Sequence, residues 1–264
     1  MEINGATAVV TGAAGGLGGA IARALSARGA RLILTDRREE ALKSLASQLN
    51  GAEIHVCDLA NAAQVAELSA RVADTDIVVA NAALPATGKL DDFTPEQLNR
   101  ALDVNLRVPM LMTQQLLPGM LQRGRGHFVY ISSIAGKLPS ARVPIYSATK
   151  AGLRGFCGSL RQDLHGSGVG ASVVFPGTMT DAGLLADAGL PATPGTKGTS
   201  CDFVANRVVA AIVKNLGEVD AAELPVRIMA RFGGIAPELA ARLARRKDSV
   251  AWGDQVTEGL RHLR

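Results

Sequence analysis

Thr11-Gly12-Ala13-Ala14-Gly15-Gly16-Leu17-Gly18 stands between an apolar run, Ala6–Val10, and a helix-like stretch, Leu17–Arg28. Glycines permit a sharp backbone turn and a close approach to a ligand. A helix N-terminus then offers free amides and the positive end of a dipole to a phosphate group. Between a strand and a helix, this stretch predicts a dinucleotide site, with a purely structural turn as the alternative. The predicted contacts are Gly12, Gly15, Gly16, Leu17 and Gly18.

Outward from this loop, short apolar runs alternate with helix-like stretches. The runs predict strands at Ala6–Val10, Arg31–Thr35, Glu53–Val56, Asp76–Ala80, His127–Ile131, Ala171–Phe175 and Glu218–Ala222. The stretches predict helices at Leu17–Arg28, Glu39–Leu49, Ala62–Ala73, Pro95–Gln122, Ile145–Leu164 and Phe203–Leu216. This alternation is typical of an α/β protein whose doubly wound parallel sheet has helices on both faces. We expect about seven strands in a single domain.

Two segments break this alternation. Residues 177–200 are rich in Gly, Thr, Ala and Pro and are too long for an ordinary connection, so we expect a mobile lid or substrate loop. Residues 225–264 follow the last expected strand, and we interpret them as a helical extension of the same domain. Within them, Pro237–Lys247 predicts a helix with Leu239 and Leu243 on one side and Arg242, Arg245 and Arg246 elsewhere. This tail either packs on the substrate pocket or a subunit interface, or makes weak contact with a membrane surface through residues 225–247.

Composition narrows the function classes. The chain has 264 residues, a net charge of +4 and an aromatic fraction of 3%, which argues against nucleic acid as a partner. Cys57, Cys157 and Cys201 form no CxxC pair, the histidines are scattered, and no metal-site spacing is present. Sparse cysteines, the absence of an apolar run near ~18 residues and an early first strand favour a cytoplasmic protein.

Tyr146 and Lys150 place a phenol and an ammonium on one face of a predicted helix. A phenol is a poor acid or base at neutral pH because its pKa is near ~10. A nearby lysine cation favours the phenolate and lowers that pKa. The pair therefore predicts a tuned proton donor and acceptor, although the spacing alone also occurs on ordinary helix surfaces.

Asp36 closes the second predicted strand. An acid at this distance from a glycine loop accepts hydrogen bonds from the adenosine ribose and repels a 2′-phosphate, which favours NAD over NADP. Gly15 also leaves the loop without a basic side chain. Arg37 and Arg38 follow directly, and either of them can pair with a 2′-phosphate instead.

Taken together, these residues resemble the short-chain dehydrogenase/reductase family in its classical, single-domain form. Thr11, Gly12, Gly16 and Gly18 match the family's TGxxxGxG, and Tyr146 with Lys150 matches its YxxxK. Further matches are Asp58-Leu59, Asn81-Ala82-Ala83, Asn105, Ser133 and Pro176-Gly177, over roughly residues 5–222. The resemblance implies a Rossmann-type catalytic domain over residues 1–224, an NAD(P)-dependent oxidoreductase acting on CH–OH groups, and a homodimer or homotetramer.

The resemblance also implies a role for each matched residue. Ser133 would stabilise charge on the substrate oxygen, Tyr146 would exchange the alcohol proton, and Lys150 would lower the tyrosine pKa and hold the nicotinamide ribose. Asn105 would hold a water that links Lys150 to solvent. The implied cofactor contacts are Gly12, Gly15, Gly16, Leu17, Gly18, Asp36, Arg37, Asp58, Leu59, Asn81, Ala82, Tyr146, Lys150, Pro176, Gly177 and Thr178.

Two positions depart from the family pattern. Ala83 replaces a usual glycine, and Asp181 replaces a usual threonine, with Thr178 and Thr180 close by. The leading interpretation is an NAD-dependent enzyme for a secondary alcohol or ketone with an apolar or bulky body. One alternative is an NADP-dependent 3-oxoacyl thioester reductase. Another is a non-catalytic dinucleotide sensor that binds a protein partner.

Overall fold

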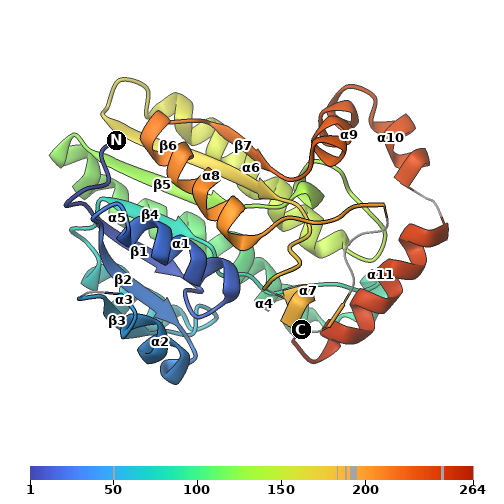
Figure 1. The fold of residues 1–264 in the computed structure, drawn as a ribbon, viewed down its shortest axis with the longest axis horizontal. Coiled ribbons are helices and arrows are strands. Elements are labelled where there is room, and N and C mark those ends of the chain that lie inside the picture. The colour runs from blue at the N-terminus through green and yellow to red at the C-terminus, as the bar shows by residue number, and fades with distance from the viewer. Residues whose placement is uncertain (50, 183, 188, 191–194, 245–246, 264) are drawn as a thin grey trace.

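A parallel β-sheet forms the centre of the protein (Figure 1). The computed structural model describes residues 1–264 except 50, 183, 188, 191–194, 245–246 and 264. The strands are β1 (Thr7–Thr11), β2 (Arg31–Asp36), β3 (Glu53–Val56), β4 (Ile77–Ala80), β5 (Gly126–Ile131), β6 (Val169–Pro176) and β7 (Glu218–Ala221). The α-helices are α1 (Gly16–Ser26), α2 (Glu39–Ala46), α3 (Ala62–Arg71), α4 (Pro95–Leu102), α5 (Val108–Arg123), α6 (Pro144–Asp163), α7 (Leu184–Asp187), α8 (Cys201–Lys214), α9 (Leu224–Ile235), α10 (Pro237–Ala244) and α11 (Lys247–Leu260).

The strand order is β3-β2-β1-β4-β5-β6-β7, and every neighbouring pair is parallel. The chain starts at β1, runs outward to β3, and then returns to build the other half from β4 to β7. The winding therefore reverses between β1 and β4, where ligands bind at the carboxyl ends of the strands in sheets of this kind. The predicted single-domain, doubly wound sheet of about seven strands is confirmed.

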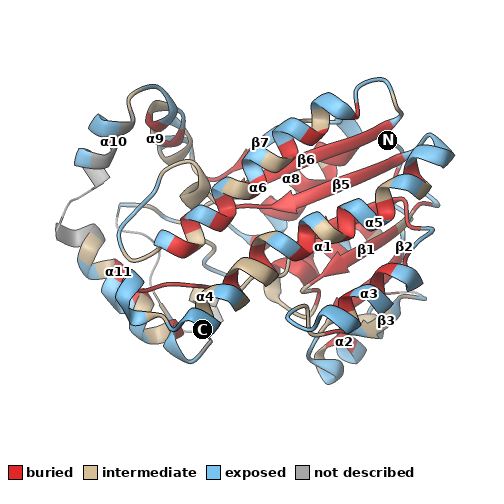
Figure 2. Cartoon of the chain, turned by 180° about the vertical axis from the view of Figure 1, so that it is seen from behind, coloured by how far each residue is buried: buried red, intermediate tan, exposed pale blue. Residues whose placement is uncertain are grey.

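Two hydrophobic cores lie on the two faces of the sheet. Ala8 and Val10 of β1 pack in one core with α1, α2 and α8, whereas Val9 packs in the other with α3, α5 and α6. Successive side chains of a strand alternate between faces, so a strand covered on both sides must be apolar throughout. Figure 2 shows the result as buried strands between helices that each bury one side.

The predicted helix Pro95–Gln122 is interrupted. A π-helical segment, Asp103–Arg107, separates α4 from α5 and contains Asn105. Pro109 has no amide hydrogen, so it cannot donate to the carbonyl of Asn105, which is its ordinary α-helical acceptor. The wider turn is the local consequence, and such π turns occur frequently at functional sites.

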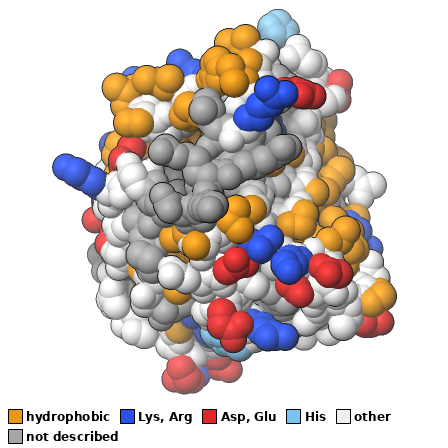
Figure 3. All heavy atoms as spheres, turned by 90° about the vertical axis from the view of Figure 1, so that its right-hand side faces the viewer, with side chains coloured by type: hydrophobic (Ala, Val, Ile, Leu, Met, Phe, Trp, Pro, Cys, Tyr) orange, Lys and Arg blue, Asp and Glu red, His pale blue; other side chains and the backbone are white. Residues whose placement is uncertain are grey.

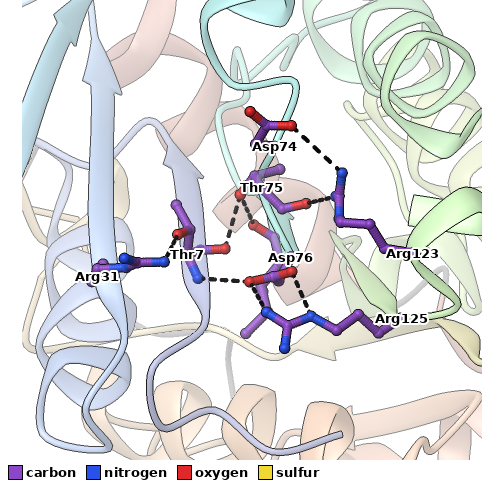
Figure 4. Close-up of polar contacts among 8 residues, drawn as sticks. Thr7, Arg31, Asp74, Thr75, Asp76, Arg123 and Arg125 are labelled. Carbon is purple, nitrogen blue, oxygen red and sulfur yellow. Dashed lines mark hydrogen bonds and ion pairs between the residues drawn. The ribbon is translucent and has the colours of Figure 1, made fainter. Parts of the chain in front are cut away.

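At the amino ends of the strands, a polar network ties β1, β4 and β5 together (Figure 4). The buried Asp76 carboxylate accepts the Thr7 amide at 3.0 Å and two Arg125 nitrogens at 3.0 and 2.7 Å. Burial alone raises the pKa of Asp76, but these hydrogen bonds and the charge of Arg125 outweigh it and hold the pKa below its ordinary value. Arg123 adds a hydrogen bond to the Thr75 carbonyl at 2.7 Å.

The two irregular segments take definite forms in the described residues. Within 177–200, α7 forms and Met179 pairs with Thr199 as a β-bridge. The tail contains α9, α10 and α11, followed by a 3₁₀ turn, Arg261–Leu263. The predicted Pro237–Lys247 helix begins as α10 does, but α10 ends at Ala244 and Lys247 is the first residue of α11. Arg245 and Arg246 lie outside the described residues.

Figure 3 views the molecule from the side of these tail helices, and apolar, basic and acidic side chains all reach that surface. Among the described residues, no helix is long and apolar enough to cross a membrane.

Candidate active site

A cavity of about 940 Å³ lies at the carboxyl ends of the strands and gathers almost all of the predicted site residues. From the predicted set it is lined by Gly12, Gly15, Gly16, Leu17, Gly18, Asp36, Arg37, Asp58, Leu59, Asn81, Ala82, Ser133, Tyr146, Lys150, Pro176, Gly177 and Thr178. Asn105 is buried behind it. Residues from the glycine loop and from α6, separated by about half the chain, therefore share one hollow.

The glycine loop is shaped by close backbone approaches. Gly12 has φ +64°, and a Cβ there would lie 2.8 Å from the Ala82 Cα. A Cβ on Gly18 would collide with the Gly12 carbonyl oxygen and lie 2.9 Å from the Asn81 amide nitrogen. Gly15 caps α1 without a side-chain hydrogen bond, so the first amides of α1 keep their capacity for a ligand. This cradle fits a pyrophosphate.

Asn81 braces the loop from the neighbouring strand end. Its side-chain nitrogen donates to the carbonyls of Thr11 at 2.9 Å and Gly12 at 3.2 Å. The Thr11 hydroxyl in turn accepts the backbone amides of Asn81 at 3.0 Å and Ala82 at 3.1 Å. Asn81 therefore shapes the cradle as well as lining it. Ala83 also lines the cavity, in place of the family's glycine.

Asp36 ends β2 at the cavity wall and is engaged by Arg38. The Arg38 guanidinium donates to the Asp36 carboxylate from Nε at 3.1 Å and from Nη2 at 3.4 Å. Arg38 Nη2 also lies 3.9 Å from the position that a Cβ on Gly15 would occupy. The glycine loop contains no basic side chain, but the Arg38 guanidinium lies beside it. The sequence did not decide whether Arg37 or Arg38 would take this place.

Ser133, Tyr146 and Lys150 meet where β5 ends and α6 begins. Lys150 is buried, and its Nζ donates to the Ile131 carbonyl at 2.8 Å. The Ser132 hydroxyl donates to the Lys150 carbonyl at 2.8 Å. Gly136 completes the contact, because a Cβ there would lie 2.8 Å from the same carbonyl. The strand end and the helix are thereby held in one arrangement.

The proton affinities of this cluster differ from the simple prediction. Burial raises the pKa of Tyr146, and a hydrogen bond with Ser133 only partly offsets this. Burial also lowers the pKa of Lys150 to about 7. The net direction for Tyr146 is thus opposite to the lowering expected from the lysine alone, because desolvation dominates. The Lys150 Nζ lies 5.5 Å from the centre of the Tyr146 ring.

Asn105 uses its side chain on the backbone of Leu84. Its amide oxygen accepts the Leu84 amide at 2.7 Å, and its amide nitrogen donates to the Leu84 carbonyl at 2.9 Å. Leu84 lines the cavity, so Asn105 positions a wall residue. The side chain has no contact with Lys150 among these bonds.

Two threonines, Thr178 and Thr180, follow β6. Thr178 lines the cavity, as predicted. Asp181, which stands where the family pattern has threonine, instead accepts the Cys201 amide at 3.0 Å at the start of α8. Asp181 therefore has a structural role at the start of α8, and Thr178 is the threonine of this turn that lines the cavity.

At the opposite end of the cavity, the sequence offered the tail as one possible wall but singled out none of its residues. The cavity walls there include Met229 of α9 and Trp252, Val256 and Leu260 of α11. The only available signal was the single tryptophan of the chain, placed in a tail with no family pattern. These walls are apolar, so the end of the cavity away from the glycine loop suits an apolar ligand body.

Known proteins match both the sequence and the fold. The family model for short chain dehydrogenases covers residues 6–188. The chain is 33% identical over 257 residues to the ketoacyl reductase HetN of Nostoc sp., covering 92% of this chain and 89% of that one.

Two solved structures are similar as well. A metagenomic short-chain oxidoreductase in complex with NADP is 32% identical, with a TM-score of 0.69, and the match covers 83% of this chain and 97% of that one. A short chain dehydrogenase/reductase from Burkholderia phymatum in complex with NAD is 25% identical, with a TM-score of 0.78 and coverages of 91% and 97%. The chain is therefore an oxidoreductase of the short-chain dehydrogenase family, acting on hydroxyl or carbonyl groups with a nicotinamide cofactor.

Proposed function

We propose that this enzyme transfers a hydride between a nicotinamide cofactor and a secondary alcohol or ketone with an apolar body, and that Tyr146 exchanges the proton. The observation that carries the proposal is the shared cavity, which puts Ser133, Tyr146 and Lys150 within the same walls as the glycine loop. The nicotinamide supplies the hydride chemistry when it is bound. The remaining work is orientation and proton transfer, which fall to the chain's own side chains.

Each of the three residues has a distinct task in this proposal. The Ser133 hydroxyl holds the substrate oxygen and stabilises the charge that develops there. The Tyr146 hydroxyl takes the alcohol proton in oxidation and returns it in reduction. Lys150, with its pKa lowered to about 7, changes charge near neutral pH and thereby tunes the Tyr146 phenol.

We assign Asn105 a positioning task. Its side chain is hydrogen-bonded to the Leu84 backbone. The backbone carbonyl of Asn105 lacks its ordinary α-helical donor, because residue 109 is proline. A water that links Lys150 to solvent would therefore bind to this backbone carbonyl.

We propose NAD as the preferred cofactor. The Asp36 carboxylate is suited to accept hydroxyl groups of the adenosine ribose, and it repels a 2′-phosphate. Arg38 weakens this preference because its guanidinium neutralises part of that charge. Kinetics with NAD and NADP under identical conditions test the proposal, and a kcat/KM that favours NADP would overturn it.

A second candidate is a 3-oxoacyl thioester reductase, favoured by the similarity to a protein named ketoacyl reductase. Its substrate is also a ketone, so Ser133 and Tyr146 keep their tasks. A panel that includes simple apolar ketones and a 3-oxoacyl thioester separates the two. Higher kcat/KM for the thioester by 10-fold or more would replace the first proposal with the second.

Tyr146→Phe tests the chemistry directly. We expect turnover to fall by at least 100-fold, since general acid–base catalysis contributes about 10²–10⁴-fold, while NADH binding stays within threefold. Near-normal turnover would rule out Tyr146 as the proton carrier. NADH binding by the wild type without turnover on the whole panel would favour the dinucleotide sensor.

Three predictions about the surroundings of the enzyme remain proposals. We retain a homodimer or homotetramer and a cytoplasmic location. Weak membrane contact through residues 225–247 is supported by exposed Ile228, Ile235 and Leu239. Liposome flotation of the full chain tests this contact, and absence of flotation with anionic vesicles would remove it.

A further inference from the structure

Helix α11 closes the substrate end of the cavity. Trp252, Val256 and Leu260 recur every fourth residue and all line the cavity, so one side of α11 forms a wall. In Figure 1, α11 lies at the far right of the molecule, beyond the carboxyl ends of the strands. It contributes this wall from outside the sheet, and its position depends on the contacts that fasten it.

The first fastening joins α11 to the loop before α6. Arg142 donates from its guanidinium to both carboxylate oxygens of Asp254, at 2.5 Å from Nε and 3.3 Å from Nη2. Next to it, Gly253 packs so closely that a Cβ would lie 3.0 Å from the Arg142 Cγ. These contacts hold the first turns of α11, including Trp252, against this loop.

That loop is itself anchored to strand β7 and to Gly88, and it leads into the catalytic helix. At its start, Lys137 Nζ lies 2.6 Å from Asp220 and 2.8 Å from Glu218, both in β7. Near its end, Arg142 has φ +67°, an uncommon conformation for a residue with a Cβ, and its carbonyl accepts the Gly88 amide at 2.6 Å. Tyr146 follows four residues later, so Arg142 joins α11 to the segment that leads into the catalytic helix.

The second fastening joins α11 to the substrate loop. Gly259 faces Leu190, and a Cβ on Gly259 would lie 2.9 Å from the Leu190 Cδ1. Leu190 belongs to the segment 177–200, which also contributes Thr178 and Leu185 to the cavity. Helix α11 therefore bridges two segments that border the reacting centre.

We propose that α11 selects substrates by size, that Trp252 is the specificity-determining residue, and that Arg142 and Asp254 are positioning residues that hold it. The proposal rests on the proposed oxidoreductase function and adds a residue-level basis for its substrate range. Trp252 is a large, rigid side chain on an apolar wall, so it limits the volume left for the substrate body. Removing it enlarges the pocket without touching Ser133, Tyr146 or Lys150.

The Arg142–Asp254 pair makes the wall sensitive to charge. The Asp254 side chain is 55% exposed and that of Arg142 is 23% exposed, so dissolved salt weakens their attraction. Arg142 lowers the pKa of Asp254, and Lys89 acts in the same direction. Asp91 and Asp92 also face Arg142 and raise its pKa together with Asp254.

Trp252 offers a direct measurement because it is the sole tryptophan of the chain. The Tyr146→Phe variant, saturated with NADH, is titrated with 2-tetralone while Trp252 emission is followed. We expect a saturable change in emission, which reports binding at α11 without turnover. Saturable binding that leaves Trp252 emission unchanged would overturn the placement of Trp252 against substrate, even if the proposed chemistry is correct.

Specificity kinetics test the size selection. Trp252→Ala is expected to raise the ratio of kcat/KM for 2-tetralone over that for cyclohexanone by about 10-fold or more, because a few buried carbons are worth about 10–200-fold in discrimination. Trp252→Phe should give an intermediate ratio. An unchanged ratio in Trp252→Ala, with NADH binding and folding intact, would refute the assignment.

The fastening is tested with a matched pair on the same helix. Asp254→Asn is expected to raise KM for 2-tetralone about three- to tenfold with kcat unchanged. We expect the KM of the wild type to rise with NaCl and the KM of Asp254→Asn not to change with it. Glu258→Gln is the control, since the ion pair of Glu258 among the described residues lies within the tail, with Arg261 at 3.8 Å. Equal KM values for Asp254→Asn and Glu258→Gln would refute the positioning role of the Arg142–Asp254 pair.

Discussion

Gly18 and Gly19 are adjacent in α1 and provide a paired test of the phosphate cradle. A Cβ on Gly18 would collide with the Gly12 carbonyl and lie 2.9 Å from both the Ala13 Cα and the Asn81 Nδ2. A Cβ on Gly19 would meet the flexible Arg23 side chain first, at 3.4 Å. The same methyl group is therefore excluded at one position and accepted at the next.

The expected magnitudes follow from these contacts. Gly18→Ala forces the start of α1 to retreat from the loop by roughly 1 Å, and such overpacking costs about 1–3 kcal/mol. Alanine recovers about 1 kcal/mol through its higher helix propensity at either position. Gly18→Ala should thus lose about 0–2 kcal/mol of stability, whereas Gly19→Ala should gain up to about 1 kcal/mol.

The functional effect should be larger than the effect on stability. A displacement of about 1 Å in a binding constellation can cost on the order of 100-fold in rate. We expect Gly18→Ala to lower kcat/KM for the cofactor by about that factor, with Gly19→Ala near the wild-type value. NADH titration by fluorescence and urea unfolding measure the two effects separately. Gly18→Ala binding NADH within threefold of the wild type would refute the cradle.

Three further predictions concern charge. Asp36→Ala should raise kcat/KM for NADP at least 10-fold, since it removes the repelling carboxylate and leaves Arg38 beside the 2′-phosphate position; an unchanged NADP/NAD ratio would contradict this. Asp76→Asn should cost about 2 kcal/mol at pH 7, a value between those of exposed and buried ion pairs, because Asp76 is buried and Arg125 is more than half exposed. Folding lowers the pKa of Asp76. The wild type is therefore more stable than Asp76→Asn above the pKa of the unfolded chain, near ~3.9, and this difference in stability must shrink as pH falls through the pKa of the folded protein. Thermal unfolding from pH 7 to pH 3 measures it, and a constant difference would be inconsistent with the shift. Lys150 gives up a proton on folding between pH 7 and pH 10, because its pKa in the folded protein is lowered to about 7. The stability of the wild type therefore rises with pH over this range. The stability of Lys150→Met relative to the wild type should accordingly be higher at pH 7 than at pH 10. A stability difference that does not fall between pH 7 and pH 10 in urea unfolding would contradict the buried lysine.

The sheet could be predicted because its signals are local. Continuous apolar runs such as Val78–Ala80 mark strands buried on both faces, and the glycine loop marks the first turn into a helix. The predicted helix at residues 95–122 was too simple, because it missed the π-helical segment Asp103–Arg107. The hydrogen bond from the Leu84 amide to the Asn105 side chain was hidden as well, since it joins residues 21 positions apart, which no periodicity reveals.

The site was predictable residue by residue at its cofactor end, whereas at its substrate end the sequence offered a role for the tail without naming the residues that line the cavity. Gly12, Asp36 and Tyr146 belong to spacings whose chemistry is general, so the sequence places them in one cavity. Trp252 reaches that cavity through a fastening between Arg142 and Asp254, which lie 112 residues apart. The upward pKa shift of Tyr146 was equally hidden, because it arises from burial by the folded walls.

The Asp76–Arg125 network lies at the amino ends of the strands and the cavity lies at their carboxyl ends, and this separation has a practical consequence. In a parallel sheet the binding and catalytic residues lie at the carboxyl ends of the strands, so residues at the amino ends can serve stability alone. Stabilising substitutions around Thr7, Thr75 or Arg123 can therefore accumulate with little effect on substrate range. Conversely, α11 can be redesigned for new substrates, and stabilising substitutions at the amino ends of the strands can offset the loss of stability that such changes cause.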